Sequence, residues 1–360
     1  RLAIRYQHNR VLRKPAFVET ALHVADVLLS PGDEQDRSAS HLKPIFGGGF
    51  GRAYRRTAAN RPRSGGYGRK ILSPTLSVVI AAYNMERELP RTVRSLSPMM
   101  QRGVDRAAYE LIVVDNGSAR PIDLTGHAGT VDLRVLRVDP AQASASPVAA
   151  LNLAAAGARG DLLGMMIDGA RLASPGLLAA ASEAARIAPR AVILSLGFHL
   201  GPKVQMESVH EGYDQMVEDR LLEQSGWLAD GYRLFDVSVF AGSSLNGWFG
   251  PLNESNAIFM RRALWEELGG FDPAFRCAGG GLANLDLLVR AVTLPDVVVV
   301  TLLGEGTFHQ VHGGVATNAR ENVTHLFAAE YERLRGRPFA TPEYDSRYYG
   351  TLTRRSERVR

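Results

Sequence analysis

Polar side chains stand directly after two short apolar runs in the first half of the chain. The run 76–82 is followed by Tyr83 and Asn84, and the run 111–114 is followed by Asp115. A carboxylate accepts hydrogen bonds, and an amide both donates and accepts them. These positions can therefore recognise a ligand that carries N–H groups, hydroxyls and carbonyls.

A second group of residues has the chemistry of a metal site. Asp168 follows another apolar run, 161–167, and offers the oxygen ligand that Mg²⁺ and Mn²⁺ prefer. His309 and His312 are three residues apart, and imidazole suits a transition-type divalent ion such as Mn²⁺. A histidine pair of this kind is also common as a hydrogen-bonded part of the scaffold, so both interpretations stay open.

The elements around these residues alternate between strand and helix. Short, β-branched apolar runs without alternation are typical of parallel strands covered on both faces, and parallel sheets bind ligands beyond the carboxyl ends of their strands. Between the first two runs, apolar residues over 89–100 follow helical spacing, with Asn84 as the expected N-cap and Pro90 in the first turn. We therefore expect both polar turns to meet at one crevice. The absence of glycine over 82–86 excludes a P-loop or dinucleotide fingerprint.

The same periodicity predicts the remaining elements. Strands are expected over 131–138, 161–167, 234–240, 256–260 and 296–303, and helices over 147–158, 205–224, 261–269 and 322–334, with one further helix and strand within 175–200.

The segments 76–86 and 111–118 resemble the opening of family 2 glycosyltransferases, and the likeness extends with gaps from about Ser73 to about Gly314. The resemblance implies an α/β protein with a GT-A-like fold, in which a Rossmann-like, mostly parallel central sheet is flanked by helices in an α/β/α arrangement. It also implies transfer of a sugar from a nucleotide-sugar donor.

The resemblance assigns roles to individual positions of this chain. The donor nucleotide would contact Tyr83, Asn84, Glu86, Asp115, Asn152 and Asp168. Asp168 stands where the family has the first carboxylate of Asp-x-Asp, but Ala170 replaces the second. We expect one divalent cation, Mn²⁺ or Mg²⁺, on Asp168 with His309 or His312, while a cation such as Arg171 is the alternative neutraliser of the diphosphate.

The acceptor side departs further from the family pattern. The family usually shows Gly-Gly-Glu-Asp-Leu-Asp-Leu where this chain has residues 281–287, so Asn284 replaces an acidic residue. An inverting transfer needs a carboxylate to take the proton of the acceptor hydroxyl. The candidates are Asp286 first, then Glu254, then Asp272. Trp248 is a candidate acceptor platform, because aromatic rings pack against sugar C–H groups, although a core position is equally compatible.

Composition limits the class of protein. The 360 residues are 45% hydrophobic, which is enough for one large or two small domains, and no run reaches the roughly 18 apolar residues of a membrane helix. The start of the sequence shows no secretory signal. The single cysteine, Cys277, excludes an internal disulfide framework, so a reducing cytoplasm is expected, with a peripheral position at the inner face of the membrane as the alternative.

Charge divides the chain into three parts. Residues 1–73 hold 14 Lys/Arg against 5 Asp/Glu and residues 331–360 hold 8 against 4, so the centre is acidic although the net charge is +5. We expect a basic, partly disordered N-terminal extension (1–72), a GT-A domain (73–335) and a basic C-terminal tail (336–360). The acidic centre argues against nucleic acid as a partner, and the basic ends allow peripheral membrane contact.

The sequence therefore predicts a family 2-like, inverting glycosyltransferase of glycan or cell-surface polysaccharide biosynthesis. Its partners would be a nucleotide-sugar donor and a glycan, lipid-linked or small-molecule acceptor. An inactive sugar-nucleotide-binding or scaffold protein is the alternative, because Ala170 and Asn284 replace carboxylates. A sugar-nucleotide pyrophosphorylase is disfavoured, because its glycine-rich basic loop is missing after the first strand.

Overall fold

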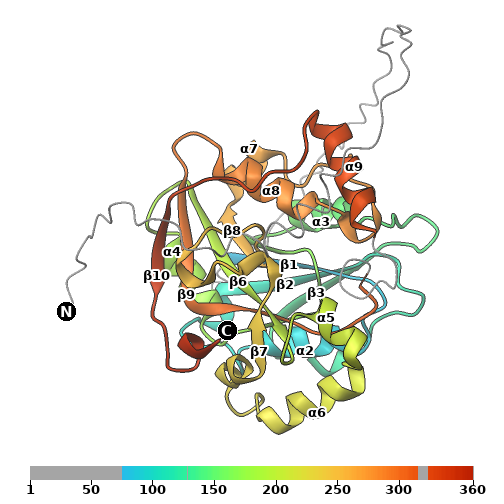
Figure 1. Ribbon diagram of the computed structural model, residues 1–360, viewed down its shortest axis with the longest axis vertical. Helices are drawn as coiled ribbons and strands as arrows, with labels where there is room; N and C mark the ends of the chain where they lie inside the picture. The colour runs from blue at the N-terminus through green and yellow to red at the C-terminus, as the bar shows by residue number, and fades with distance from the viewer. Residues whose placement is uncertain (1–74, 128, 315–322, 360) are drawn as a thin grey trace, which may run out of the picture. The chain divides into compact units, whose positions relative to one another are not determined.

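The computed structural model describes residues 75–127, 129–314 and 323–359 (Figure 1). Apolar spacing also predicts a helix over 17–29, but this segment and the rest of the N-terminal extension 1–72 lie outside the described residues. Within the described ranges, no helix combines the length and the apolar character needed to cross a membrane.

One mixed sheet runs through the described chain in the strand order β10-β9-β6-β8-β4-β1-β2-β3, and β5 and β7 pair with β9 and β6 (Figure 1). The strands β4, β1, β2 and β3 are parallel neighbours, β9 is parallel to β6 and β10, and β8 is antiparallel to both neighbours. The strands are β1 (Leu76–Ala82), β2 (Tyr109–Asp115), β3 (Asp132–Arg137), β4 (Leu162–Met166), β5 (Arg171–Ala173), β6 (Ala191–Leu200), β7 (Ser238–Phe240), β8 (Ile258–Arg261), β9 (Val298–His309) and β10 (Ser346–Gly350).

Helices cover both faces of this sheet. Successive residues of a strand point to opposite faces, so alternate residues of β1 pack in different apolar clusters. Val79 and Ala81 belong to a buried apolar cluster that includes side chains of α3, α7 and α8. Val78 and Ile80 belong to a second cluster that includes side chains of α2 and α4. The predicted α/β/α arrangement is confirmed. The helices are α2 (Glu88–Ser95), α3 (Val148–Ala156), α4 (Leu177–Ala184), α5 (Gln205–Ser208), α6 (Gln215–Ser225), α7 (Arg262–Leu268), α8 (Ala283–Val292) and α9 (Thr324–Arg335).

The first two strands behave as their sequence predicts. Every residue of β1 and β2 is buried, and the parallel register runs from Leu76 opposite Tyr109 to Ala82 opposite Asp115. Because both strands end at the same level, the polar turns that follow them come out side by side. The two polar turns therefore lie at one edge of the sheet, while the crevice between them stays a prediction.

The helix expected over 205–224 is wrong as a continuous element. α5 ends at Ser208, and Gly212 adopts the left-handed backbone conformation with φ of 94°. α6 then starts afresh, with the Asp214 carboxylate accepting from the backbone N–H of Val217. The break follows from ordinary stop and start signals, a left-handed glycine and an aspartate cap, that the apolar spacing concealed.

The strand expected over 234–240 is also mostly wrong. Gly231–Val237 is a 3₁₀ helix, and only Ser238–Phe240 pairs as β7. The Asp230 side chain accepts from the backbone N–H of Tyr232 and so stabilises the start of the helical turn. This local hydrogen bond outweighs the strand propensity of the apolar residues that follow it.

β9 is longer than the strand expected over 296–303. Its parallel register with β6 shifts between Leu194 and Leu196, where Gly304 of β9 takes a φ of 76°, and pairing then resumes as far as His309. The shift lets the strand continue across an irregularity, as β-bulges do. His309 therefore ends a strand and does not lie in a loop.

The C-terminal residues add a strand to the sheet. β10 pairs in parallel with β9, with Ser346 opposite Val299 and Gly350 opposite Leu303. The sheet therefore continues past Arg335, although the division of the chain into three parts stays a prediction.

Candidate metal and nucleotide site

The two polar turns contact each other through Asn84. Its backbone N–H donates to the Ser118 hydroxyl (2.8 Å), and its side-chain oxygen accepts from the backbone N–H of Ala119 (3.0 Å). Asn84 does not cap α2 as expected, because Arg87 occupies the N-cap position without a side-chain capping bond. Its φ of 51° turns the chain between the two strand ends, a conformation that asparagine tolerates better than most residues.

The other residues expected at the nucleotide differ in exposure. Asp115 is buried, accepts from the Ser118 backbone N–H (2.9 Å) and has its second oxygen 3.9 Å from Arg137 Nε. Tyr83 is 57% exposed, and the Glu86 carboxylate lies 3.7 Å from Arg120 at the surface. At this edge of the sheet, Asp115 is thus buried and hydrogen-bonded, while Tyr83 and Glu86 are accessible.

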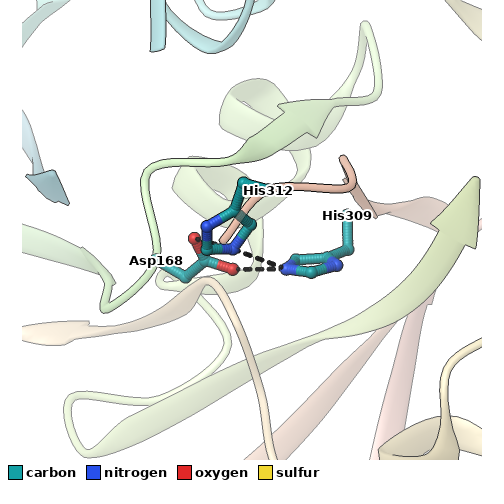
Figure 2. A group of neighbouring side chains, drawn as sticks. All are labelled: Asp168, His309 and His312. Atoms are coloured by element: carbon teal, nitrogen blue, oxygen red, sulfur yellow. Dashed lines mark hydrogen bonds and ion pairs between the residues drawn. The ribbon is translucent and has the colours of Figure 1, made fainter. Parts of the chain in front are cut away.

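Asp168, His309 and His312 converge at one point beyond the ends of β4 and β9 (Figure 2). His309 Nε2 lies 2.9 Å from Asp168 Oδ2 and 3.2 Å from His312 Nε2, and His312 Nε2 lies 3.6 Å from Asp168 Oδ1. Figure 2 shows both imidazole rings directed at the carboxylate. The structure therefore brings together the three residues that the sequence proposes as metal ligands.

A tight turn after β4 makes this convergence possible. Asp168 Oδ1 accepts from the Ala170 backbone N–H, and the chain reverses so that β5 pairs antiparallel with the end of β9. Gln310 N–H donates to the Ala170 carbonyl (2.8 Å), which holds the histidine segment against the turn. Gly169 is required here, because a Cβ atom would lie 2.5 Å from the carbonyl oxygen of Ala81 on β1.

Gln205 fixes the proton of His309. The Gln205 side-chain N–H donates to the His309 carbonyl (2.9 Å), so its side-chain oxygen faces His309 Nδ1 at 2.5 Å. An amide oxygen can only accept, so Nδ1 carries the proton. Burial lowers the pKa of His309 to about 4, against the opposing effect of Asp168. The ring is therefore neutral near pH 7, and Nε2 presents a lone pair to Asp168.

This arrangement fits a cation. Burial alone would raise the pKa of Asp168, but the cationic Arg171 is among the neighbours that hold it well below its ordinary value, so the carboxylate is ionised. A carboxylate oxygen and an imidazole lone pair 2.9 Å apart repel each other unless a positive charge lies between them. Ligands at right angles, each about 2.1 Å from a metal, are themselves roughly 3 Å apart. One carboxylate and two imidazoles suit Mn²⁺ or a similar divalent ion.

Replacing Gln205 by leucine is expected to weaken Mn²⁺ binding about 10- to 100-fold, because His309 then loses the acceptor that holds its proton on Nδ1. Isothermal titration of the full chain with Mn²⁺ measures the effect. Gln224→Leu, on the exposed face of α6, is the matched control and should bind Mn²⁺ like the wild type. Equal affinities for the Gln205 variant and the control would show that the tautomer is set in another way.

A cavity of about 490 Å³ opens beside His312. Its walls come from the connection between α5 and α6 and from the residues after β9, and they include Tyr213, Met216 and Gly313. Glu218 supports this wall from behind, since its carboxylate accepts from the Val311 N–H (2.7 Å), the Tyr213 hydroxyl and Arg87. The position of His312 therefore depends on a buried carboxylate.

Glu218 makes stability depend on pH. Its burial raises its pKa to about 7, although Val311 N–H and Arg87 favour the charged form. Because the folded-state pKa of Glu218 lies above its unfolded value, the protonated form of Glu218 stabilises the folded state relative to the charged form. This contribution to the free energy of unfolding is full below about pH 4.5 and is lost as the pH rises through about 7. We expect Glu218→Gln to remove about 2 kcal/mol of the fall in unfolding free energy between about pH 5 and about pH 8. Urea unfolding at both pH values measures this, with the exposed Glu223→Gln as control. An unchanged pH profile would contradict the assignment.

Two of the three candidate bases lie in a separate ionic cluster. Asp286 is 1% exposed and pairs with Arg290 (2.7 Å) and with Arg335 (2.5 Å and 2.8 Å). Asp272 pairs with the same Arg335 at 2.8 Å. The first choice from the sequence, Asp286, has no access to a substrate hydroxyl, because both of its oxygens are held by arginines under the surface. Its geometry is that of a brace between α8 and α9.

Glu254 is the candidate that the structure places in an accessible position. It is half-buried in the loop before β8, and one of its oxygens accepts from the Asn284 side chain at 2.7 Å. Asn284, at the start of α8, also donates toward the backbone of Ser255. The residue that replaces the family's acidic group thus holds another carboxylate, at a position that the aligned motif alone does not reveal.

Two further residues expected to contact a ligand, Asn152 and Trp248, form hydrogen bonds within the protein instead. Asn152 donates to the Phe271 carbonyl and accepts from the Phe271 N–H, so its amide joins α3 to the loop after α7. Trp248 is buried, packs on Phe198 and Phe235, and donates from Nε1 to the Ser356 carbonyl. Trp248 therefore belongs to the aromatic core, since a sugar cannot reach its face there.

Sequence reasoning missed the supporting residues. His199 accepts from the Gln205 backbone N–H (2.9 Å), and its ring lies 5.3 Å from that of His309. The available signal was a histidine within a fully buried strand followed closely by a glutamine, and both are unusual inside a core.

Comparison with known proteins follows from this geometry. Residues 77–240 match the family model described as glycosyl transferase family 2. The match includes Asn84, Asp115 and Asp168 and ends before His309 and His312. No curated protein matches the chain.

Solved structures with similarity to the chain have low sequence identity. S. aureus TarS 1-349 in complex with UDP-GlcNAc is 15% identical, with a TM-score of 0.43 over 72% of this chain and 66% of that one. Mannosyltransferase PcManGT from Pyrobaculum calidifontis, in complex with GDP-Man and Mn²⁺, is 19% identical, with a TM-score of 0.38 over 63% of this chain and 56% of that one. The chain thus spans less than two thirds of the length of these structures.

Proposed function

We propose that this chain, in which residues 77–240 form a glycosyl transferase family 2 domain, transfers a sugar from a nucleotide-sugar donor to an acceptor hydroxyl with inversion. The observation that carries the proposal is the meeting of Asp168, His309 and His312, whose ligand atoms all lie within 4.8 Å of one another, at the ends of two strands of one sheet. A site of this kind lies where parallel sheets bind ligands.

The residues at the first two strand ends hold the nucleoside in this proposal. Asp115 accepts from a base N–H or a ribose hydroxyl, while Asn84 fixes the turn and Tyr83 and Glu86 contact the exposed side of the nucleotide. Asp168, His309 and His312 would hold a divalent ion, which would supply positive charge to neutralise the diphosphate leaving group. Gln205 keeps His309 in the tautomer that leaves Nε2 free for that ion.

Glu254 is the proposed general base. Its carboxylate is accessible and is oriented by the hydrogen bond from Asn284, so it can take the proton of the attacking hydroxyl. Asp286 and Asp272 are not carried forward as bases, because arginines pair with both oxygens of Asp286, and Arg335 and the Ala274 backbone N–H occupy the two oxygens of Asp272. Asn152 and Trp248 likewise keep structural roles.

Donor hydrolysis tests the proposal without knowledge of the acceptor, because water can replace the acceptor hydroxyl. We expect the full chain with Mn²⁺ to release nucleotide from at least one of UDP-glucose, UDP-GlcNAc and GDP-mannose, and Glu254→Gln to slow this about 100-fold. Glu223→Gln is the control for loss of an exposed carboxylate. Equal rates for Glu254→Gln and the wild type would remove Glu254 from the chemistry.

An inactive sugar-nucleotide-binding or scaffold protein is the second candidate, favoured by Ala170 and Asn284 in place of carboxylates. Nucleotide binding without hydrolysis of any donor would select it. Exchange of pyrophosphate into a nucleotide sugar would instead indicate a pyrophosphorylase.

The proposal also covers the pathway, the compartment and the acceptor of the reaction. We place it in glycan or cell-surface polysaccharide biosynthesis in the cytoplasm, with a glycan, lipid-linked or small-molecule acceptor. The basic charge of residues 1–73 and 331–360 supports contact with an anionic membrane surface.

A further inference from the structure

Arg171 is a buried arginine beside the three proposed metal ligands. It begins β5 and lies directly opposite His309 in the antiparallel pairing of β5 with β9. Residues directly opposite each other on antiparallel strands project from the same face of the sheet. The side chain of Arg171 therefore shares the face of His309, and only 7% of the residue is exposed.

The guanidinium of Arg171 lacks the acceptors that a buried arginine normally has. Its Nε and Nη1 atoms are buried and make no hydrogen bond within the described residues. Asp168 is its ion-pair partner, with Nε 3.3 Å from Oδ2, but this contact does not have hydrogen-bond geometry. Arginine carries five N–H donors, and a buried donor without an acceptor is costly. The guanidinium of Arg171 can therefore donate hydrogen bonds to further acceptor oxygens, which the described residues do not supply.

The charge of the site identifies those oxygens. The carboxylate of Asp168 and the guanidinium of Arg171 cancel, so a divalent ion gives the site an excess of about two positive charges. The diphosphate of a nucleotide sugar carries about two negative charges, which match that excess. An aspartate in place of Ala170, without the arginine, would leave almost no excess before the anion binds. The loss of the second carboxylate at Ala170, together with the guanidinium of the adjacent Arg171, therefore favours an anionic ligand.

We propose that Arg171 binds the donor's diphosphate through its planar fork, so that this chain holds the anion with a cation of its own in addition to the divalent ion. Arginine and phosphate commonly pair through two parallel hydrogen bonds. The inference rests on the proposed function, because it names the residue that contacts the leaving group in the same site. It differs from a purely structural pairing of Arg171 with Asp168, which would need no further acceptor.

Isothermal titration with inorganic pyrophosphate in the presence of Mn²⁺ tests the inference, because the divalent ion gives the site the positive excess that the anion matches. We expect the full-length wild type to bind pyrophosphate and Arg171→Met to lose about 10- to 100-fold in affinity. Arg171→Lys keeps the charge but loses the fork, and it should lose about five-fold. Arg186→Met removes an exposed arginine of the surface pair with Glu183 and should leave the affinity unchanged. Mn²⁺ binding without an anion should persist in Arg171→Met.

Several results would overturn the inference. These are the absence of pyrophosphate binding by the wild type with Mn²⁺, equal affinities for the wild type and Arg171→Met, or loss of Mn²⁺ binding in Arg171→Met, which would make the arginine a structural partner of Asp168. If Arg171→Met does not fold, wild-type affinity in Arg171→Lys overturns it. The proposed function fails separately, when pyrophosphate binds through Arg171 but no nucleoside diphosphate binds and no donor is hydrolysed.

Discussion

Replacing Asp168 by asparagine is expected to reduce Mn²⁺-dependent donor hydrolysis about 1000-fold. The substitution keeps the size of the side chain but removes the one ionised oxygen ligand among the three convergent groups. His309 and His312 then face a neutral amide, and two imidazoles alone hold a divalent ion weakly. Electrostatic stabilisation of a leaving group is commonly the largest single contribution to an enzymatic rate, so most of the activity is lost with the ion.

Nucleotide release with increasing Mn²⁺ measures this loss. Asp105→Asn is the matched control, because Asp105 is exposed and caps the short 3₁₀ turn before β2, at the opposite end of that strand from the site. Its rate should equal that of the wild type. Retention of full Mn²⁺-dependent hydrolysis in Asp168→Asn would remove Asp168 from the metal site.

Replacing Asp286 by asparagine is expected to lower the free energy of unfolding by about 3 kcal/mol while donor hydrolysis is retained. The substitution leaves Arg290 and Arg335 without the buried carboxylate that both contact, and breaking a buried ion pair from one side typically costs about 3–5 kcal/mol. The lower end applies, because both arginines are about a quarter exposed and retain other partners.

Urea unfolding and donor hydrolysis on the same samples separate a brace from a base. Asp132→Asn removes a half-exposed partner of Arg159 at the surface and should change stability by less than about 1 kcal/mol. The opposite pattern for Asp286→Asn, wild-type stability with hydrolysis lost, would restore Asp286 as the catalytic base and displace Glu254.

The parallel half of the fold follows from local sequence. The runs that became β1 and β2 are apolar on both faces, and a strand of that kind is stable only between two layers of helices. The α5–α6 break and the 3₁₀ helix before β7 were not predicted, because single capping side chains, Asp214 and Asp230, overrode the apolar pattern. The length of β9 depends on a register shift against β6, a tertiary feature that no local pattern records.

The candidate site divides in the same way. Residue chemistry and family resemblance identified Asp168, His309 and His312, and the fold brings all three together. The ranking of Asp286 above Glu254 could not take account of burial and arginine partners, because these depend on how α8 and α9 pack. Gln205 and Arg171 both lie next to His309, which is distant from them in sequence, so this neighbourhood could not be read from local patterns.

Isothermal titration with UDP, GDP and dTDP, each with Mn²⁺ and with EDTA, tests the central claim most directly. For the wild type, we predict micromolar binding of one nucleotide that depends on Mn²⁺, and for Asp168→Asn and His309→Ala, the loss of that Mn²⁺ dependence. Absence of binding for all three nucleotides, or binding that Mn²⁺ does not change in any of the proteins, would contradict a metal-assisted nucleotide-sugar site.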